Sequence, residues 1–183
     1  AASEAFGAGS VSTKFLKDFR HVSRTVEVLA PGTLTTIHDH PGRVGYWEIG
    51  IPPSGPMDSR SFELANMIVG NPKEAAGLEM TMNGPALRFH SDSVIALTGA
   101  DMGATLNEKP IGRWTAISVK ADDIIKLGGI LGEGARAYLA IRHGIDVPPY
   151  LGSRSTFTLG AFGGHGGRPL RAGDVLHQDQ VKA

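Results

Sequence analysis

The sequence of 183 residues has no cysteine, no excess of either charge and no long apolar run. Without cysteine there is no disulfide framework, thiolate zinc site or cysteine nucleophile, and a cytoplasmic setting is expected. Lysine plus arginine number 18, as do aspartate plus glutamate, so the net charge does not favour nucleic acid or an anionic membrane as a partner. No segment approaches the roughly 18 apolar residues of a membrane span, and no basic-then-apolar signal pattern opens the chain. We therefore expect a soluble protein.

Glycine is abundant, at 25 residues, while amphipathic runs of helix length are few. One helix is predicted from Asp58 or Ser59 to Val69, because Asp58 is a good N-cap and Gly70 with Pro72 stops the pattern. Short apolar runs between turn residues predict about six strands and hence a mainly β barrel or sandwich. These runs are RTVEVLAPG (24–32), GLEMTM (77–82), ALRFH (86–90), SVIALTG (93–99), ATLNEKPI (104–111) with a turn near Asn107-Glu108, WTAISVKADDIIKLGG (114–129) and ARAYLAIRHG (135–144).

The composition changes near Ser23 and again at Ile145. Residues 1–23 are small and polar with a short basic-aromatic piece, which predicts a linker or tail. Residues 24–183 are predicted to form the domain. From Ile145 a long stretch rich in Gly, Pro, Ser and Arg is predicted to be a functional or interface segment, because structureless connections of this length are uncommon. The strand-entry pattern LRAGDVL (170–176) comes just before the end, so we expect the domain to be incomplete at its C-terminus.

The segment His38-Asp39-His40 raises the question of a metal site. Histidines at i and i+2 of a strand face the same side, so two imidazoles could meet one divalent ion, but no third ligand lies nearby in the sequence. Hydrogen-bonding surface histidines beside the Pro41-Gly42 turn are the more common arrangement. Asp39 can either accept N–H groups of that turn or pair with Arg43.

Three further positions carry chemistry at turns. Ser54 and Gly55 resemble a loop whose backbone N–H groups bind an anion, whereas no Gly-x-Ser-x-Gly elbow supports Ser54 as a nucleophile. Asp101 follows an apolar strand in a glycine-rich bend, where ligand-binding groups and ordinary turn aspartates are equally common. Asp58 is at least a helix cap.

The richest segment is GSRSTFTLGAFGGHGGRP (152–169). Arg154 is flanked by Ser153 and Ser155, and His165 stands between two pairs of glycines. So many glycines predict a backbone that approaches another group closely or adopts positive φ. Arg154 and Arg168 could hold a carboxylate or another planar anion through paired N–H donors. The alternative is a flexible surface loop.

Together these motifs resemble the first half of the carboxyltransferase domain of the allophanate hydrolase subunit 2-like family. The resemblance runs from about Val26 to Leu176 through VLAPG, HPGRVGYWEIGIPPSGPMD, GPALRF, IALTGADMGATLN, and ARAYLAIRHGIDVPPYLGSRSTF with the glycine-rich segment after it. This family includes urea carboxylase, urea amidolyase and a subunit of 5-oxoprolinase. HPGRVGYWEIG is most similar to the urea enzymes.

The resemblance implies a mainly β, cyclophilin-like barrel with one or two short helices. It implies a part of the carboxyltransferase of a biotin-dependent urea carboxylase, a ligase that transfers a carboxyl group from carboxybiotin to urea and forms allophanate. Biotin would be carried as carboxybiotin on a separate carrier domain, and ATP would be used by a separate biotin carboxylase domain. A subunit 1-like domain is a further implied partner, and no metal is implied. The isolated chain is expected to be inactive.

Carboxyl transfer to urea needs a polar wall for urea, an anion site and proton movement. Asp39 and Asp101 are accordingly assigned to urea or its support, with Arg43 orienting Asp39 or an anion. Ser54, Gly55, Asp58 and Ser155 are assigned to substrate binding. Arg154 and Arg168, with the loops around Ser54 and His165, are assigned to the carboxybiotin side, and His165 is a candidate proton shuttle.

This sequence departs from its relatives at two positions. The family usually has glutamine where His38 stands, and an aromatic or aliphatic residue at His40, which weakens the metal hypothesis further. Two other functions are compatible with the resemblance. One is that of a 5-oxoprolinase subunit, and the other is that of a non-catalytic regulatory module that docks on a subunit 1-like partner.

Overall fold

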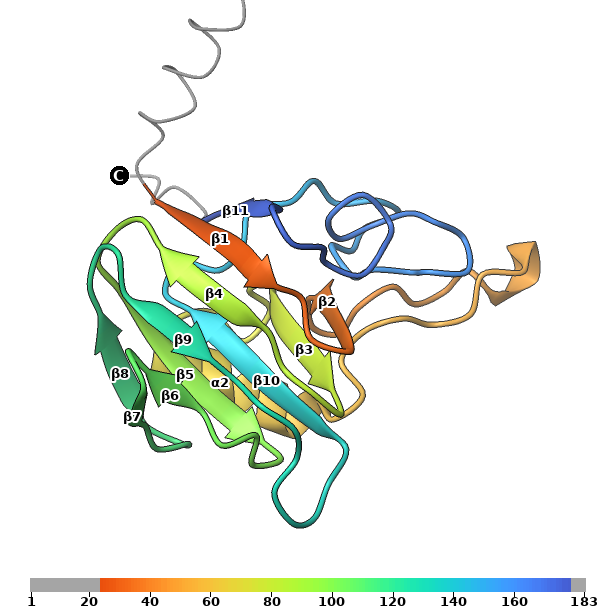
Figure 1. Ribbon diagram of the computed structural model, residues 1–183. Coiled ribbons are helices and arrows are strands. Elements are labelled where there is room, and N and C mark those ends of the chain that lie inside the picture. Colours follow the sequence, from red (N-terminus) through yellow and green to blue (C-terminus); the bar gives the residue numbers. More distant parts are fainter. Residues whose placement is uncertain (1–23, 179–183) are drawn as a thin grey trace, which may run out of the picture.

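The computed structural model describes residues 24–178, so the linker or tail predicted over residues 1–23 lies outside the described part. The described chain is mainly β, with the helix α2 (Ser59–Ile68) and the short 3-10 helix η1 (Trp47–Ile49) (Figure 1). The predicted mainly β class is confirmed. Within residues 24–178, neither helix has the length and apolar character needed to cross a membrane.

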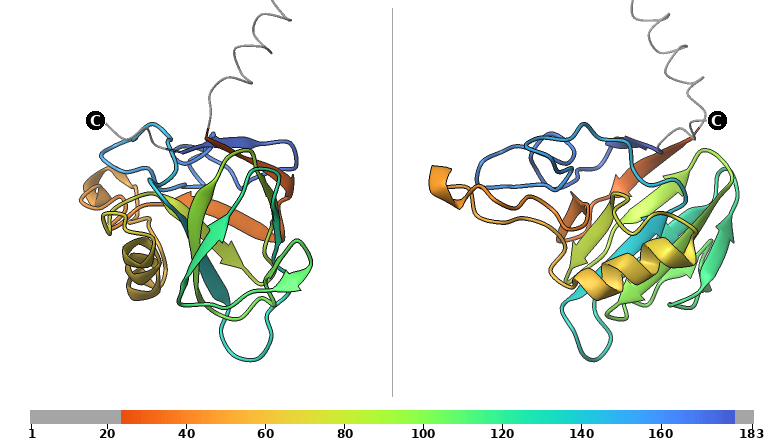
Figure 2. Two further views of the ribbon diagram at one scale, coloured as in Figure 1. Left: turned by 90° about the vertical axis from the view of Figure 1, so that its left-hand side faces the viewer. Right: turned by 180° about the vertical axis from the view of Figure 1, so that it is seen from behind.

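The strands form two antiparallel sheets. In spatial order, the first sheet contains β11 (Val175–His177), β1 (Thr25–Ala30), β4 (Ala86–Phe89), β9 (Ile124–Lys126), β6 (Thr105–Leu106) and β7 (Lys109–Pro110). In spatial order, the second sheet contains β2 (Leu34–His38), β3 (Gly77–Thr81), β10 (Arg136–Ile141), β5 (Ser93–Gly99) and β8 (Ala116–Val119). The two sheets face each other around one core (Figure 2).

Side-chain alternation divides the second sheet into a core face and a helix face. On β5, Ile95 and Leu97 lie in the core between the sheets, whereas Ala96 packs under α2. On β10, Leu139 faces the core and Ala140 faces the helix. This period of two is what a strand buried on both faces requires. The first sheet contributes the buried side chains Val26, Val28, Leu87, Phe89 and Ile125 to the same core.

Helix α2 covers the outer face of the second sheet (Figure 2). The Asp58 carboxylate caps it by accepting a hydrogen bond from the Ser61 N–H at 3.1 Å. Ala65 and Val69 pack on alanines of β5 and β10, which leave room for a close helix. Gly70, with φ of 79°, follows the last turn and ends the helix. The helix predicted from the sequence is therefore confirmed to within one residue at each end.

The strand predictions hold with two exceptions. The turn at Asn107-Glu108 is confirmed, because both residues have positive φ between β6 and β7. Strand β2, which has the sequence LTTIH, was missed. The run 114–129 is two strands that belong to different sheets, β8 and β9. A turn at 120–123 separates them, in which Asp123 accepts the Lys120 N–H at 2.7 Å.

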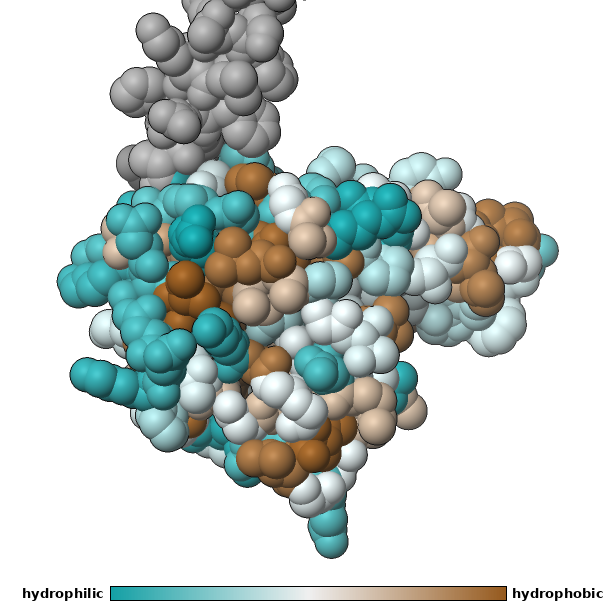
Figure 3. Space-filling view, in the orientation of Figure 1, coloured by the Kyte–Doolittle hydropathy of each residue, from teal (hydrophilic) through white to brown (hydrophobic). Residues whose placement is uncertain are grey.

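Two long segments without regular strands, residues 39–58 and 145–174, lie side by side and project from the sheets (Figures 1 and 2). We call them the loop lobe. Its tip carries η1 and the exposed side chains Val44, Trp47 and Ile49. Hydrophobic residues are visible on the surface of the projecting end in Figure 3.

The central core should respond to truncation far more strongly than the loop lobe. Leu139 is 0% exposed, so Leu139→Ala should lower the free energy of unfolding by about 3 kcal/mol through lost burial and a cavity. Leu159 is 89% exposed, and Leu159→Ala should change the free energy of unfolding by less than about 0.5 kcal/mol. Chemical denaturation of both variants measures the difference, and equal effects would contradict the assigned core.

Candidate functional site

The loop lobe begins as a narrow ribbon directly after β2. The backbones of Arg43 and Ser54 pair in both directions, with Arg43 N–H to Ser54 O at 2.7 Å and Ser54 N–H to Arg43 O at 3.0 Å. The two sides approach so closely that a Cβ on Gly42 would lie 1.8 Å from the Ser54 carbonyl oxygen. Gly42 also has φ of 85°, so only glycine fits this position. The ribbon therefore holds Ser54 and Gly55 beside the end of β2.

Asp39 joins this ribbon to the second segment of the lobe. Its Oδ1 accepts hydrogen bonds from Ser153 Oγ at 2.6 Å and Ser155 Oγ at 2.7 Å. Its Oδ2 accepts the Arg154 backbone N–H at 2.7 Å. Both oxygens of the carboxylate are therefore engaged by residues 153–155, and Asp39 fixes the position of that turn.

Arg43 is 1% exposed and lies between the same two segments. Its guanidinium donates to Ser54 Oγ at 2.8 Å and to the carbonyls of Tyr150 at 3.0 Å and Ser155 at 3.0 Å. A longer bond of 3.3 Å reaches the Ser153 carbonyl. The guanidinium carbon also lies 4.8 Å from the centre of the Phe162 ring, within cation–π range. Arg43 thus holds the lobe together and donates hydrogen bonds to buried carbonyl groups that would otherwise have no partner.

The glycine-rich turn packs against Arg43 and Ser155. A Cβ on Gly163 would lie 2.1 Å from the Ser155 carbonyl oxygen and 2.9 Å from an Arg43 Nη atom. Gly164 donates its N–H to the Arg154 carbonyl at 2.9 Å. The close approach and positive φ that the glycines predicted are confirmed, and this segment is an ordered turn.

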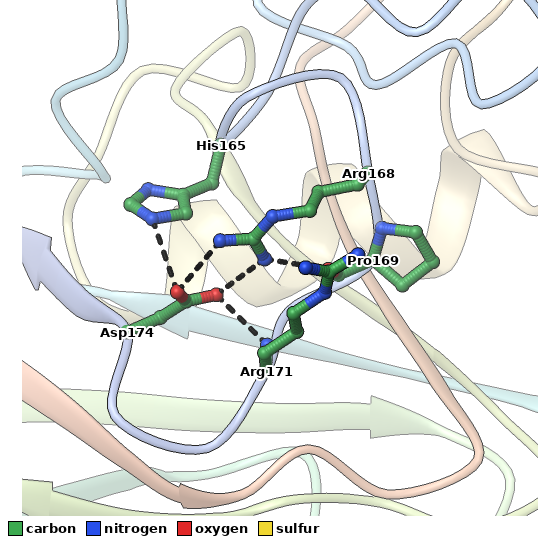
Figure 4. A network of polar contacts seen from close by, with 5 residues as sticks. All are labelled: His165, Arg168, Pro169, Arg171 and Asp174. Carbon is green, nitrogen blue, oxygen red and sulfur yellow. Dashed lines mark hydrogen bonds and ion pairs between the residues drawn. The ribbon is translucent and has the colours of Figure 1, made fainter.

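Beyond this turn, Arg168, His165 and Asp174 form a compact polar network (Figure 4). Both Nη atoms of Arg168 bind the Asp174 carboxylate, at 2.7 and 2.8 Å. His165 Nε2 lies 3.5 Å from Asp174 Oδ1. The Arg168 guanidinium is the main cause that lowers the pKa of Asp174 to about 2. The predicted anion-binding capacity of Arg168 is thus directed at a carboxylate of this chain.

A different part of the predicted site lies at the start of α2. The Asp58 N–H donates to the Tyr138 hydroxyl at 2.8 Å, and hydrogen bonds from Ser61 lower the pKa of the Asp58 carboxyl. Glu79, which is 7% exposed, accepts the Met57 N–H at 2.8 Å and binds Arg136 Nε at 3.1 Å. Burial raises the pKa of Tyr138 above its usual range, so its hydroxyl remains protonated.

Met57, Asp58, Ser61, Arg136 and Tyr138, but not Glu79, line an open hollow of about 530 Å³, which we call the α2 hollow. Trp114, 46% exposed, and Met57, 71% exposed, offer apolar surface, while Arg136 offers N–H donors. The remaining lining residues are Gly99, Ala100, Glu133, Gly134 and Ala135. An open hollow with an aromatic side chain and polar groups suits a small polar molecule.

Asp101 follows Ala100 at the edge of the α2 hollow. One carboxylate oxygen accepts the Gly103 N–H at 2.9 Å, and the other lies 3.6 Å from Arg113 Nε. Its side chain is 44% exposed, in contrast to the engaged carboxylate of Asp39. Asp101 is therefore an accessible acceptor for N–H groups of a ligand.

The two histidines of the HDH motif point to different partners. His38 Nε2 lies 2.9 Å from Thr36 Oγ1, and burial lowers the pKa of the ring. His40 Nε2 lies 2.8 Å from Glu63 Oε1 on α2. Within residues 24–178, no three histidine, aspartate or glutamate side chains form a group able to hold a metal ion.

The structure brings most of the predicted residues into one place and leaves two elsewhere. The lobe gathers Asp39, Arg43, Ser54, Gly55, Arg154 and Ser155, with His165 and Arg168 on the adjoining turn. Asp58 and Asp101 belong to the α2 hollow and its edge. Sequence reasoning missed Glu79, Arg136 and Tyr138. The signal that could have found Glu79 is a lone carboxylate in the middle of the apolar strand GLEMTM.

The sequence and fold are similar to those of known proteins. Residues 49–183 match the family model described as carboxyltransferase domain, subdomain A and B. Urea amidolyase of Lachancea kluyveri is 52% identical over 98% of this chain and 10% of its own length. A 5-oxoprolinase subunit of Escherichia coli is 36% identical over 82% of this chain and 48% of its own length. The chain thus spans only a tenth to a half of these curated relatives.

Solved structures give the same relationship. The crystal structure of the Kluyveromyces lactis urea carboxylase superposes with a TM-score of 0.83 at 54% identity, covering 86% of this chain and 14% of that chain. The crystal structure of TTHA0988 superposes with a TM-score of 0.80 at 34% identity, covering 87% of this chain and 31% of that chain. The arrangement of the two sheets, the helix and the lobe is therefore shared with experimentally determined structures.

Removal of the Arg43 side chain should destabilise the protein. Arg43→Ala leaves buried carbonyls without donors, and we expect a loss of about 3 kcal/mol in the free energy of unfolding. Arg171→Ala is the matched control, because that side chain is exposed, and it should change stability by less than about 0.5 kcal/mol. Chemical denaturation provides the measurement, and an Arg43→Ala protein as stable as the control would refute the assignment.

The Asp174 network should make stability depend on acid pH. The pKa of Asp174 is about 2 in the folded protein and about 4 in the unfolded chain, so its stabilisation is present above pH 4 and lost as the pH falls toward 2. Asp174→Asn should therefore cost about 1–2 kcal/mol at pH 7, and less as the pH falls. Unfolding free energies of both proteins between pH 2 and about 7 test this. Asp122→Asn, at an exposed turn, is the control, and a pH-independent cost for Asp174→Asn would contradict the network.

Proposed function

Because the chain belongs to the carboxyltransferase domain family, subdomain A and B, we propose that it supplies part of the carboxyltransferase of a biotin-dependent urea carboxylase. The reaction transfers a carboxyl group from carboxybiotin to urea and gives allophanate. The observation that carries this proposal is the similarity to the Kluyveromyces lactis urea carboxylase, at 54% identity with a TM-score of 0.83. The lower identity of 36% to the 5-oxoprolinase subunit makes a 5-oxoproline-directed role the second candidate.

The chemistry defines what the residues must provide. A urea nitrogen forms a bond to the carboxyl carbon while the bond between that carbon and the biotin nitrogen breaks. One proton leaves the urea nitrogen, and one is returned to the biotin nitrogen, so the site has to move a proton without consuming one. It also has to orient a planar molecule with four N–H bonds, for which carboxylate oxygens are suitable acceptors.

Asp101 is the carboxylate that we assign to urea. It is partly exposed, it adjoins the α2 hollow, and its contacts with Gly103 and Arg113 leave acceptor capacity. Asp58 is assigned to the wall of the same hollow, where its bonds to Ser61 and Tyr138 hold the first turn of α2. Asp39 supports the substrate wall as a positioning residue, since both its oxygens bind residues 153–155.

We assign the loop lobe to the carboxybiotin side. Arg43 binds Ser54, Tyr150, Ser153 and Ser155, so its role is to hold the ribbon around Ser54 and Gly55 in place. Arg154 and the N–H groups of the glycine-rich turn are the donors assigned to an anion, and Ser155 binds Asp39 on the other side of this turn. Arg168, whose two Nη atoms bind Asp174, supports this side by holding the turn in place. The His165 side chain is 30% exposed, and an imidazole can both accept and donate a proton, which suits a proton shuttle.

Carboxybiotin would reach this region on a separate carrier domain, after a separate biotin carboxylase has used ATP to form it. The ring of carboxybiotin needs apolar contact, and its carboxylate needs N–H donors. The α2 hollow offers Trp114 with Arg136, and Met57, a residue of the loop lobe, lines the same hollow. The side chains that line the hollow therefore fit carboxybiotin. The exposed tip with Val44, Trp47 and Ile49 is the surface that we assign to the rest of the carboxyltransferase or a subunit 1-like partner.

The test uses a complete urea carboxylase that contains this region. Asp101→Asn and Arg154→Ala should each lower urea-dependent allophanate formation by about 100-fold or more, while ATP-dependent biotin carboxylation stays within about twofold. Asp39→Asn should lower both allophanate formation and thermal stability, as expected of a positioning residue. Unchanged coupled turnover in Asp101→Asn and Arg154→Ala would refute the site.

Controls separate the alternatives. Asp122→Asn and Lys109→Ala alter exposed residues outside the site and should leave turnover unchanged. Replacing urea by 5-oxoproline distinguishes the second candidate, because a 5-oxoprolinase component would support turnover with that substrate alone. The isolated chain should not carboxylate urea. If the chain were a regulatory module, the complete assembly would turn over neither urea nor 5-oxoproline, while the chain would still bind its subunit 1-like partner.

A further inference from the structure

A second hollow, of about 320 Å³, lies where β5 begins and where β8 and β10 end, away from both parts of the proposed site. We call it the Arg142 hollow. Strands β5 and β8 line it directly, and the residues next to the start of β1 and to the ends of β10 and β11 complete its edge. The lining residues are Arg24, Asp92, Ser93, Val94, Ser118, Val119, Lys120, Arg142, His143 and Gln178.

Positive charge exceeds negative charge in this hollow. Lys120 Nζ lies 2.8 Å from Asp92 Oδ2, so these two charges largely cancel. Arg24 and Arg142 remain, and across residues 24–178 neither has a carboxylate within ion-pair distance. Arg142 uses Nε to bind the Val69 carbonyl at 3.1 Å, which anchors its guanidinium. Two cations therefore border one concave surface whose one carboxylate, Asp92, is already paired with Lys120.

Gln178 gives an independent indication of a ligand. Its side chain is 5% exposed, and its Oε1 is 3.5 Å from Ser93 Oγ. Its Nε2 is buried, and among residues 24–178 no acceptor lies within hydrogen-bond distance of it. An unused buried amide donor costs stability, so its place in the wall of a cationic hollow points to an acceptor that binds there.

The turn that carries Arg142 and His143 is held in place. His143 has φ of 74°, and its N–H donates to Asn71 Oδ1 at 2.7 Å. Asn71 Nδ2 in turn donates to the Ile141 carbonyl at 2.8 Å. Burial lowers the pKa of His143, and the charges of Arg24 and Arg142 lower it further, as expected if both guanidinium groups lie near the ring. The donors are thus preorganised, which reduces the entropy lost on binding.

We propose that the Arg142 hollow binds a phosphate group, with Arg24, Arg142 and Gln178 Nε2 as donors. A phosphate carries a charge of about −2 near neutral pH and three strongly accepting oxygens, which matches two unpaired arginines and one amide. A singly charged carboxylate would use this donor set only in part. The hollow is larger than one phosphate, so the group can be inorganic phosphate or the phosphate of a larger molecule such as a nucleotide.

The test is a titration of the chain with inorganic phosphate, adenosine monophosphate and acetate, followed by NMR of the side-chain amide of Gln178 and the ring of His143. Saturable shifts at both residues are expected with phosphate, and weaker binding with acetate. Tighter binding of adenosine monophosphate than of inorganic phosphate would identify a phosphate carried by a larger molecule, and the reverse would identify free phosphate. Absence of saturable shifts with all three would overturn the proposal.

Variants locate the binding. Arg24→Gln removes an exposed cation, and Gln178→Glu replaces the amide donor by a charge of the wrong sign, so each should weaken phosphate binding by about tenfold or more. Lys109→Gln removes an exposed cation on β7 and should leave the affinity unchanged. Thermal denaturation verifies that each variant is folded. Equal affinity of Arg24→Gln and Lys109→Gln would overturn the site even if Gln178→Glu failed to fold.

The His143 ring provides a second readout, measured in sulfate because sulfate keeps its charge over the titration range. The charged groups that line the same hollow are Arg24, Arg142, Lys120 and Asp92, of which Arg24 and Arg142 act on the ring. A bound dianion offsets the two arginines, so the pKa of His143 should rise in sulfate relative to chloride at equal ionic strength. Arg24→Gln should reduce this difference, and an unchanged pKa in sulfate would count against binding beside the ring.

Discussion

The loop lobe depends on the burial of one guanidinium. Arg43 is almost completely removed from water, and its bonds reach Ser54 on one segment and the carbonyls of residues 150–155 on the other. A neutral side chain of similar size could fill the space but could not satisfy so many acceptors, because only arginine offers five N–H donors in a fixed plane. The two segments of the loop lobe form no regular strands. Hydrogen bonds from the Arg43 side chain connect them in place of strand pairing.

Asp39 completes this arrangement from the opposite direction. Arg43 supplies donors to the main-chain carbonyls of the turn, and Asp39 supplies acceptors to Ser153, Ser155 and the N–H of Arg154. The two charged side chains therefore bind the same turn without needing a direct salt bridge. The proposed site therefore lies on a framework that the chain itself holds in place, and such preorganisation positions reacting groups at low entropic cost.

The sequence was sufficient for the fold class, the helix and most strands, because these follow from local alternation and capping. It was insufficient where a residue's role depends on distant partners. Thr36, Glu79, Tyr138 and Thr98 are cross-strand neighbours in one row of the second sheet, on the side covered by α2. Nothing local to Tyr138 indicates that it will meet Asp58. Likewise, LTTIH is too short and too polar to be distinguished from a turn until β3 pairs with it.

The equal numbers of basic and acidic residues give the net charge of the molecule but not how the charges are distributed over it. Glu27 with Arg88, Asp174 with Arg168 and Glu79 with Arg136 neutralise charge pair by pair, which removes a long-range field. Local imbalance survives only where a pairing is incomplete, as with the accessible Asp101 at the α2 hollow and with Arg24 and Arg142 at the opposite end of β5. In a nearly neutral protein of this kind, unpaired charges in concave places carry more functional information than net charge does, because charge pairing elsewhere isolates them.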